Sequence, residues 1–200
     1  MIVVVDYMMG NLRSVLKACL LTKKSVVISS DRKKIESAQK IVLPGVGAFS
    51  DAINELKRLK ILDVLKNRIN KGIPFLGVCL GMQLLFSQSE ESPGSDGLDI
   101  IPGKVIRFSR KLKVPQIGWN QIKIEDKDCP LFIGIKNNQF AYFCHSYYCL
   151  PEDKSIVAGI TYYGKRYASV IWRDNIFGVQ FHPEKSQAAG LKILENFLSL

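Results

Sequence analysis

The chain has 200 residues, a formal net charge of +10 and an apolar fraction of 47%. A chain of this length can bury roughly 70% of its unfolded surface, so it can build a hydrophobic core. The ordinary apolar and charged fractions exclude a disordered chain, a collagen and a disulfide miniprotein, and no apolar run reaches the ~18 residues of a membrane helix. We expect one globular domain over residues 1–200, without a membrane partner.

The first half of the chain alternates apolar runs with amphipathic stretches. Buried strands are predicted at residues 2–5, 25–29, 40–43 and 73–78. Helices are predicted at residues 12–22 with Asn11 as the cap, from residue 50 or 51 to 59, and at residues 62–70 and 80–86. This alternation of strands and helices implies a parallel sheet covered by helices.

The second half has a different pattern. Residues 87–97 are polar and rich in turn formers, which predicts a surface loop. Short strands that Gly, Asp and Asn separate are predicted at residues 103–108, 121–124, 140–143, 155–161, 167–172 and 176–181, and a closing helix at residues 187–198. The whole predicts an α/β fold with a central, mostly parallel sheet flanked by helices and additional antiparallel strands in the second half.

The basic residues form only short clusters, at residues 32–34, 57–60 and 110–113. Because no recognition motif accompanies them, a solvated surface is favoured over a nucleic-acid partner, and an acidic partner or a phosphorylated substrate nearby stays possible. The five cysteines are an odd count, and the apolar start at residues 1–5 meets Asp6 without the basic flank of a signal peptide. Both features indicate free thiols in the reducing cytoplasm.

The sharpest local signal is the segment from Gly77 to Gly81, which has the form G-x-C-x-G. It is a nucleophile elbow with Cys79 in place of serine. A tight strand-to-helix turn holds the central residue in a strained conformation, and small neighbours let the chain pass. The turn would place the sulfur beyond the carboxyl end of the sheet and at a helix N-terminus, where thiolate is favoured. The alternative is a buried structural cysteine with incidental glycines.

A thiolate nucleophile needs a base and a group that orients the base. His182 follows an apolar strand, and Glu184 stands two residues further, on the same side of an extended chain. His145 is the competing base, but in a strand it points away from its neighbour Cys144. A metal site built from Cys144, His145 and Cys149 is weak because a second ligand pair is missing, so we expect neither metal nor cofactor.

Acyl chemistry at a thiol also needs hydrogen-bond donors for an oxyanion. The amide of Leu80, directly after the cysteine, is one candidate. The other is the amide of Val46 or Gly47 in the segment Leu-Pro-Gly-Val-Gly, where the glycines would let a peptide plane turn over. By itself this segment is equally compatible with a plain strand-to-helix loop.

Taken together, several segments resemble the class I (triad) glutamine amidotransferases, and they follow the family order over essentially the whole chain. The matching segments are residues 6–7, 10–12, 43–49, 77–86, 115, 118–120, 145–148 and 178–186. The cysteine elbow and Phe-His-Pro-Glu mark the family. The motifs Pro-Gly-Val-Gly, Gly-Trp-Asn and His-Pro-Glu-Lys-Ser mark its histidine-pathway branch. The resemblance implies a flavodoxin-like α/β fold.

The resemblance also implies a reaction. Cys79 attacks the side-chain amide of L-glutamine, His182 moves the proton to the leaving ammonia, Glu184 orients His182, and water hydrolyses the thioester. Gln83 and the backbone near Ser146 and Tyr147 hold the substrate. The family's Pro-Gly-Val-Gly strand supplies the second oxyanion donor, Val46 or Gly47, and we expect that donor not to be in place in the free chain.

In the histidine-pathway branch the glutaminase is one subunit of a heterodimer and passes ammonia to a cyclase subunit, a (β/α)8 barrel. The interface implied by the resemblance involves Asn11, Trp119, Asn120 and Lys185. The family usually has Gly after Asp-Tyr, whereas Met8 and Met9 stand here before Gly10. The alternatives are a glutaminase subunit of a synthase that modifies sugars, a standalone cysteine hydrolase and a basic binding module.

Overall fold

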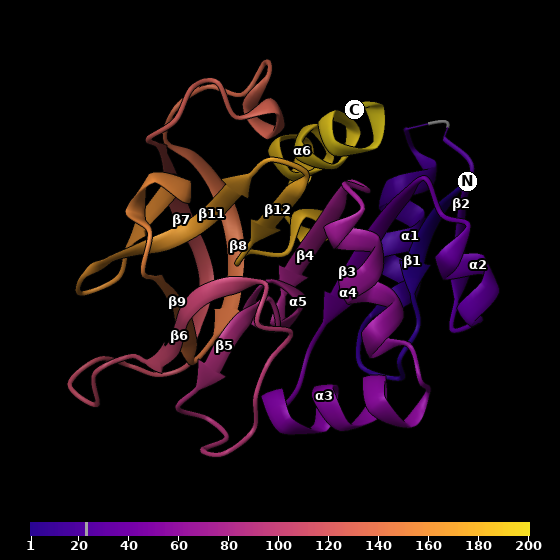
Figure 1. Cartoon of the computed structure of the whole chain (residues 1–200). Coiled ribbons are helices and arrows are strands. Elements are labelled where there is room, and N and C mark those ends of the chain that lie inside the picture. Colours follow the sequence, from indigo (N-terminus) through magenta and orange to yellow (C-terminus); the bar gives the residue numbers. More distant parts are fainter. Residues whose placement is uncertain (23) are drawn as a thin grey trace.

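A sheet of twelve strands runs through the computed structural model, which describes residues 1–22 and 24–200 (Figure 1). Its main path has the order β2-β1-β3-β4-β12-β11-β10-β7-β8. The first five strands on this path are parallel: β2 (Val26–Ser29), β1 (Ile2–Val5), β3 (Lys40–Gly45), β4 (Phe75–Cys79) and β12 (Ile176–Val179). Their carboxyl ends meet at one edge of the sheet, where open α/β folds place their sites.

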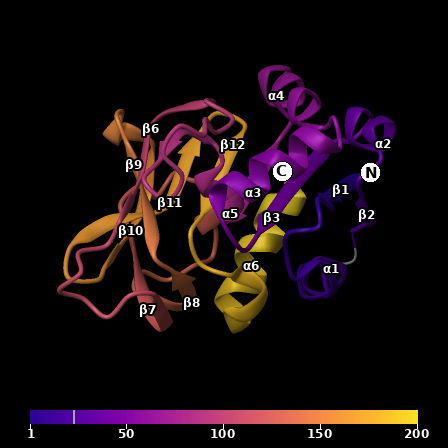
Figure 2. The ribbon, with the colours of Figure 1, turned by 90° about the horizontal axis from the view of Figure 1, so that it is seen from below.

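Helices cover both faces of this parallel part (Figure 2). Residues of α2 (Arg32–Glu36), α3 (Phe49–Arg58) and α4 (Leu62–Asn70) share one buried apolar cluster with alternate strand residues, and those of α1 (Leu12–Leu20) and α6 (Gln187–Ser199) share the other. Strands covered on both faces are continuous apolar runs, and β1 is buried at every position. Asn11 caps α1 as predicted, because its Oδ1 accepts a hydrogen bond from the Ser14 amide.

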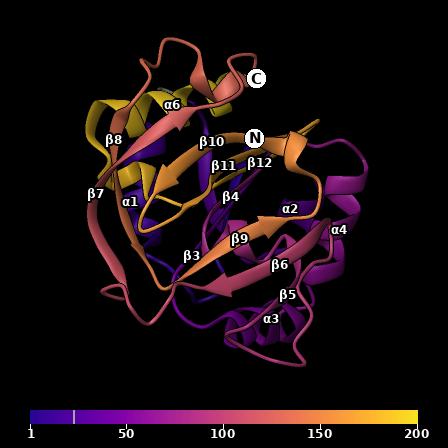
Figure 3. The same cartoon turned by 90° about the vertical axis from the view of Figure 1, so that its left-hand side faces the viewer.

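The second half adds antiparallel strands (Figure 3). These are β6 (Ile101–Arg107), β7 (Gln116–Ile124), β8 (Gln139–His145), β9 (Tyr147–Pro151), β10 (Val157–Tyr162) and β11 (Arg166–Arg173). The hairpin of β7 and β8 forms one end of the main path, and β9 joins β6 to β11. Short 3-10 turns, η1 (Pro130–Phe132), η2 (Lys154–Ile156) and η3 (Pro183–Lys185), interrupt the chain. The predicted α/β fold class is confirmed.

Helix α2 and strand β9 were not predicted, and β7 begins at Gln116 rather than at residue 121. Two further differences have a physical reason. The helix predicted at residues 80–86 is only the single turn α5 (Leu80–Gln83), and strand β5 (Phe86–Ser89) runs from the end of that predicted helix into the predicted loop. Strand β5 pairs in parallel with β6, a partner that no local pattern reveals. Helix α3 begins at Phe49 rather than at residue 50 or 51, since Glu91 and Ser92 of the loop accept its first amide hydrogens.

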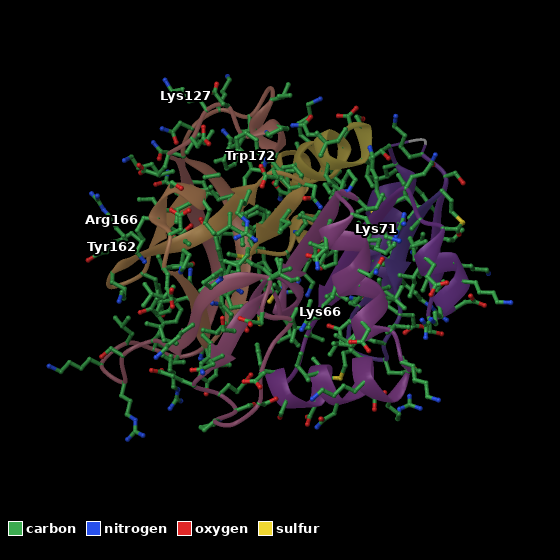
Figure 4. All side chains as sticks on the ribbon, in the orientation of Figure 1. Lys66, Lys71, Lys127, Tyr162, Arg166 and Trp172 are labelled. Carbon is green, nitrogen blue, oxygen red and sulfur yellow. The ribbon has the colours of Figure 1, made fainter. Side chains whose placement is uncertain are left out.

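The basic side chains are dispersed. Lys71 at the end of α4 and Arg166 on β11 lie on opposite sides of the molecule in Figure 4, and Lys127 lies on a third segment.

Candidate active site

Cys79 ends β4 in a strained turn, with φ of +53° and ψ of −109°. This conformation is uncommon for a residue with a side chain and is held by tight packing. A Cβ on Gly77 would lie 2.7 Å from the backbone nitrogen of Met82, and a Cβ on Gly81 would collide with the carbonyl oxygen of Leu43. The elbow geometry predicted from G-x-C-x-G is therefore present. Because α5 is one turn long, its dipole adds less than expected for a full helix.

The imidazole of His182 lies between the sulfur and a carboxylate. Its Nδ1 is 3.0 Å from Glu184 Oε1, and Cys79 is the other ionisable group that acts on the pKa of the ring. The His182 and Glu184 side chains are 7% and 2% exposed, so water does not screen their attraction. The predicted pairing is correct, but its backbone is not the extended chain we assumed, because Pro183 opens η3 and the carboxylate returns to the ring from a turn.

Burial alone would lower the pKa of His182, but the hydrogen bonds to Cys79 and Glu184 outweigh it and raise the pKa to about 10. At neutral pH the imidazole therefore holds a proton beside the sulfur. Such a proton is positioned for delivery to a group that leaves from a carbon bonded to the sulfur.

His145 is the other histidine of the chain, and its surroundings are different. Its Nδ1 lies 2.7 Å from the carbonyl oxygen of Tyr147 and its Nε2 lies 3.4 Å from the hydroxyl of Tyr167. Burial lowers the pKa of His145 to about 4, against the opposing effect of the Tyr147 carbonyl. Cys144 is exposed whereas His145 is buried, so the strand places them on opposite faces, as the sequence predicted.

A buried glutamine that the sequence analysis missed completes the surroundings of the sulfur. Gln180, two residues before His182, places its Nε2 3.7 Å from Cys79 Sγ. Its Oε1 accepts a hydrogen bond from Gln83 Nε2, which also donates to the carbonyl oxygen of Tyr147. Both amide hydrogens of Gln83 are thereby used, which fixes its side chain against the cavity. In an extended chain, residues two apart face the same side, so the spacing of Gln180 and His182 was the sequence signal that could have placed Gln180 in the site.

A cavity of about 270 Å³ opens above the sulfur. Its lining brings together most of the predicted site residues: Val46, Gly47, Cys79, Leu80, Gln83, Ser146, Tyr147, His182 and Lys185. Glu91, from the predicted surface loop, lines it as well and was also missed. Glu184 lies behind His182 and does not line the cavity.

The residues predicted for a partner interface, of which only Lys185 lines the cavity, lie on separate elements. Asn11 is exposed at the start of α1, which packs against η3. Trp119 is 47% exposed on β7 and meets the ring of Tyr142 edge-on. Lys185 Nζ lies 5.4 Å from the centre of the same tyrosine ring. Asn120 is half-buried and donates to the carbonyl oxygen of Tyr162.

Among residues 1–22 and 24–200, no group of three or more His, Cys, Asp and Glu side chains is arranged to hold a metal ion. In the same part of the chain no helix has the length and apolar character needed to cross a membrane.

The strained cysteine at a strand-to-helix turn, with an imidazole and a carboxylate in line, defines a cysteine hydrolase type of site on an α/β sheet. The model of the family "Glutamine amidotransferase class-I" matches residues 3–200. The chain belongs to the class I glutamine amidotransferase family, as the resemblance predicted.

The similar proteins agree with this assignment. The chain is 50% identical to the imidazole glycerol phosphate synthase subunit HisH of Methanocaldococcus jannaschii, over 100% of both chains. It is 49% identical to the subunit of the same name of Aquifex aeolicus, over 98% of this chain and 94% of that one. A solved glutamine amidotransferase matches the fold with a TM-score of 0.77 at 16% sequence identity, over 99% of both chains.

Proposed function

We propose that this chain is the glutaminase subunit of an imidazole glycerol phosphate synthase. It hydrolyses L-glutamine to glutamate and ammonia, and it passes the ammonia to a cyclase subunit, a (β/α)8 barrel, which makes imidazole glycerol phosphate and aminoimidazole carboxamide ribotide. The observation that carries the chemistry is that Cys79 and His182 line one cavity and that Glu184 hydrogen-bonds His182 from behind. The full-length similarity to HisH subunits supports the pathway.

The first half-reaction starts with a protonated His182 beside the Cys79 sulfur. The Cys79 sulfur forms a bond to the amide carbon of the glutamine side chain, and the electron pair of the carbonyl bond moves to oxygen. When the oxyanion collapses, the bond between carbon and nitrogen breaks. His182 gives its proton to the leaving nitrogen, and ammonia departs from a glutamyl thioester. Glu184 keeps the ring oriented and stabilises its charged form.

The second half-reaction returns the enzyme to its starting state. His182, now neutral, takes a proton from a water molecule whose oxygen attacks the thioester carbon. The bond between carbon and sulfur then breaks, glutamate leaves, and the thiolate and imidazolium form again. This sequence consumes one water molecule for each glutamine.

The lining of the cavity assigns further roles. The amides of Leu80 and of Val46 or Gly47 would donate to the oxyanion. Gln83 and the backbone near Ser146 and Tyr147 would bound the substrate. The Tyr147 carbonyl already accepts from Gln83 and faces the His145 ring, so it acts by holding those side chains. Glu91 is the carboxylate that lines the cavity, and we assign it to the α-ammonium group of glutamine.

A surface beside the cavity is suited to the cyclase subunit. Strand pairing puts Ile117 and Trp119 of β7 on the same face as Phe140 of β8, and all three are about half or more exposed. A contiguous exposed apolar face of this kind marks an interaction site. Lys185 lines the cavity, and its Nζ lies over the ring of Tyr142, which also meets Trp119 of this face. We assign Asn11, Trp119, Asn120 and Lys185 to the interface through which ammonia leaves.

The free thiols are consistent with work in the cytoplasm. All five cysteines are unpaired, and four of them are buried. A nucleophilic cysteine among unpaired thiols functions in a reducing compartment, because an oxidising one would consume it.

The test is reconstitution with the cyclase subunit. The complex is given the phosphorylated ribulosyl substrate and either glutamine or free ammonium, and glutamate and imidazole glycerol phosphate are measured. We expect both nitrogen sources to support synthesis and glutamine to yield one glutamate for each imidazole glycerol phosphate. Synthesis from ammonium but not from glutamine would overturn the proposal. The cyclase subunit alone is the control, and it should use ammonium only.

A further inference from the structure

Tyr7 has a hydroxyl group that the free chain does not use. The residue follows β1, its side chain is fully buried, and the hydroxyl has no hydrogen-bond partner among residues 1–22 and 24–200. A buried hydroxyl without a partner costs stability, whereas phenylalanine would fill the same space without that cost. Such a group in a folded protein calls for an explanation.

The position of the hydroxyl suggests its use. A Cβ on Gly45 would collide with Tyr7 Oη, so the hydroxyl occupies the space that a side chain at Gly45 would need. The Cβ position on Gly45 also lies 3.0 Å from Leu80 Cβ and 3.3 Å from the Gly81 nitrogen. Tyr7 Oη is therefore packed between the end of β3 and the cysteine elbow. These two elements carry the two amides that we assigned to the oxyanion.

The turn that contains Tyr7 also packs against residues 45–47, at the end of β3 and directly after it. A Cβ on Gly10 would lie 3.9 Å from the Cα of Gly45, and a Cβ on Gly47 would lie 2.8 Å from Met9 Cε. Gly47 has φ of +105°, which a residue with a side chain adopts only with strain. Tyr7, Met9 and Gly10 thus lie against residues 45–47, and Met9 is part of the departure from the family pattern.

We propose that Tyr7 is a positioning residue that stabilises the oxyanion hole by donating a hydrogen bond to the carbonyl of Gly45. A peptide unit is planar, with its N–H and C=O groups on opposite sides. When the amide of Val46 turns toward the sulfur, the carbonyl of Gly45 turns away from the cavity, toward Tyr7 Oη. This inference rests on the proposed function and selects Val46, rather than Gly47, as the second oxyanion donor.

The chemistry of the hydroxyl agrees with a donor role. Burial, and after it the nearby Cys79, raise the pKa of Tyr7, so the phenol keeps its proton throughout the working pH range. A neutral phenol can donate one hydrogen bond, and the Gly45 carbonyl is an acceptor.

The test is Tyr7→Phe in the complex with the cyclase subunit. If the hydroxyl acts only in the state with the oxyanion hole formed, kcat for glutamine hydrolysis falls about three- to tenfold, the value of one hydrogen bond. KM for glutamine and synthesis from ammonium stay unchanged, and the melting temperature of the isolated chain stays the same or rises. An unchanged kcat overturns the proposal, whether or not the melting temperature falls.

Tyr163→Phe is the matched control. The hydroxyl of Tyr163 donates to the carbonyl oxygen of Lys113, and the side chain is half-buried outside the cavity. Losing this satisfied hydrogen bond should lower the melting temperature by about 2–4 °C without changing kcat. The opposite signatures of the two variants separate a positioning hydroxyl from a structural one.

A second measurement examines the oxyanion hole directly. The analogue of glutamine with an aldehyde in place of the side-chain amide is attacked by the Cys79 sulfur at its aldehyde carbon. The oxygen of the resulting hemithioacetal occupies the position of the oxyanion in the reaction. Tyr7→Phe should weaken inhibition by this aldehyde by the same factor as kcat and should leave the binding of glutamate unchanged. Equal inhibition of both proteins contradicts the role of Tyr7. Wild-type complex that releases no glutamate from glutamine would instead contradict the proposed function.

Discussion

His145 and His182 line the same cavity and are about equally buried, at 6% and 5% exposure, but their surroundings shift their pKa values in opposite directions. His182 meets a carboxylate and a thiol, and its pKa is raised to about 10. His145 meets a backbone carbonyl and a tyrosine hydroxyl, and its pKa is lowered to about 4.

The difference shows what makes an imidazole reactive in this pocket. Burial favours the neutral form of both rings, and only ionisable partners reverse that effect. His145 is instead a structural group. Its ring lies among Phe108, Phe143 and Tyr167, and it holds the carbonyl of Tyr147 to which Gln83 also donates. The following variants test this contrast.

The largest expected effect comes from Cys79→Ala. Without the sulfur no thioester forms, and glutamine hydrolysis by the complex should fall by at least about 10⁴-fold. Synthesis from free ammonium should persist, because the cyclase subunit is unaltered. Glutamate release and synthesis from each nitrogen source are the measurements, and retained glutamine-dependent turnover would show that another residue is the nucleophile.

The matched variants His182→Gln and His145→Gln separate the two rings. His182→Gln removes the proton donor for the leaving ammonia and should lower kcat by about 10²- to 10⁴-fold. His145→Gln should keep kcat within about tenfold and destabilise the fold by about 1–3 kcal/mol, since it leaves buried partners unpaired. Steady-state kinetics and chemical denaturation check both variants. A reversed order of the two kcat values would exchange the roles of the histidines.

Glu184→Gln makes the environment of His182 more like that of His145. The carboxylate raises the pKa of His182, so its replacement lowers this pKa and reduces the imidazolium fraction at neutral pH. We expect kcat to fall by about 10²-fold and the pH profile of kcat to move toward lower pH on its alkaline side. An unchanged profile would mean that Glu184 does not control the protonation of His182.

The smallest effect concerns stability. The pKa of His182 is raised on folding, so its charged form contributes stability that is fully present below the unfolded pKa, near 6.5, and is lost as the pH rises through about 10. Denaturation curves of the isolated chain should therefore show a decline in the free energy of unfolding from pH 6.5 toward 10. The decline should be shallower in Glu184→Gln, and equal slopes would argue against this contribution.

The sequence identifies the residues that are fixed by local patterns. The elbow at Cys79 follows from glycine spacing, and the pairing of His182 with Glu184 follows from their separation of two residues, although η3 rather than an extended chain brings them together. Strands β1, β3 and β4 are correctly predicted because each is a largely buried apolar run. Strand β12 was predicted among the hairpin strands of the second half, but it lies parallel to β4.

Features that depend on distant segments were not predicted. Strand β5 exists because β6 pairs with it, and Glu91 reaches the cavity because its loop caps α3. Gln180 lies near Cys79 because β12 pairs with β4, and Tyr7 lies near Gly45 because β1 pairs with β3. No window of local sequence contains both partners of any of these contacts.

The most direct test of the account is a nuclear magnetic resonance titration of isotope-labelled histidine in the isolated chain, which contains two histidines. Between about pH 5 and 9, where an unperturbed histidine titrates, we expect one ring to stay protonated and the other to stay neutral. In Cys79→Ala the protonated ring should lose part of its raised pKa, and the neutral ring should not change. Two rings that both titrate near 6.5 in the wild-type chain would contradict the charge separation on which the proposed reaction depends.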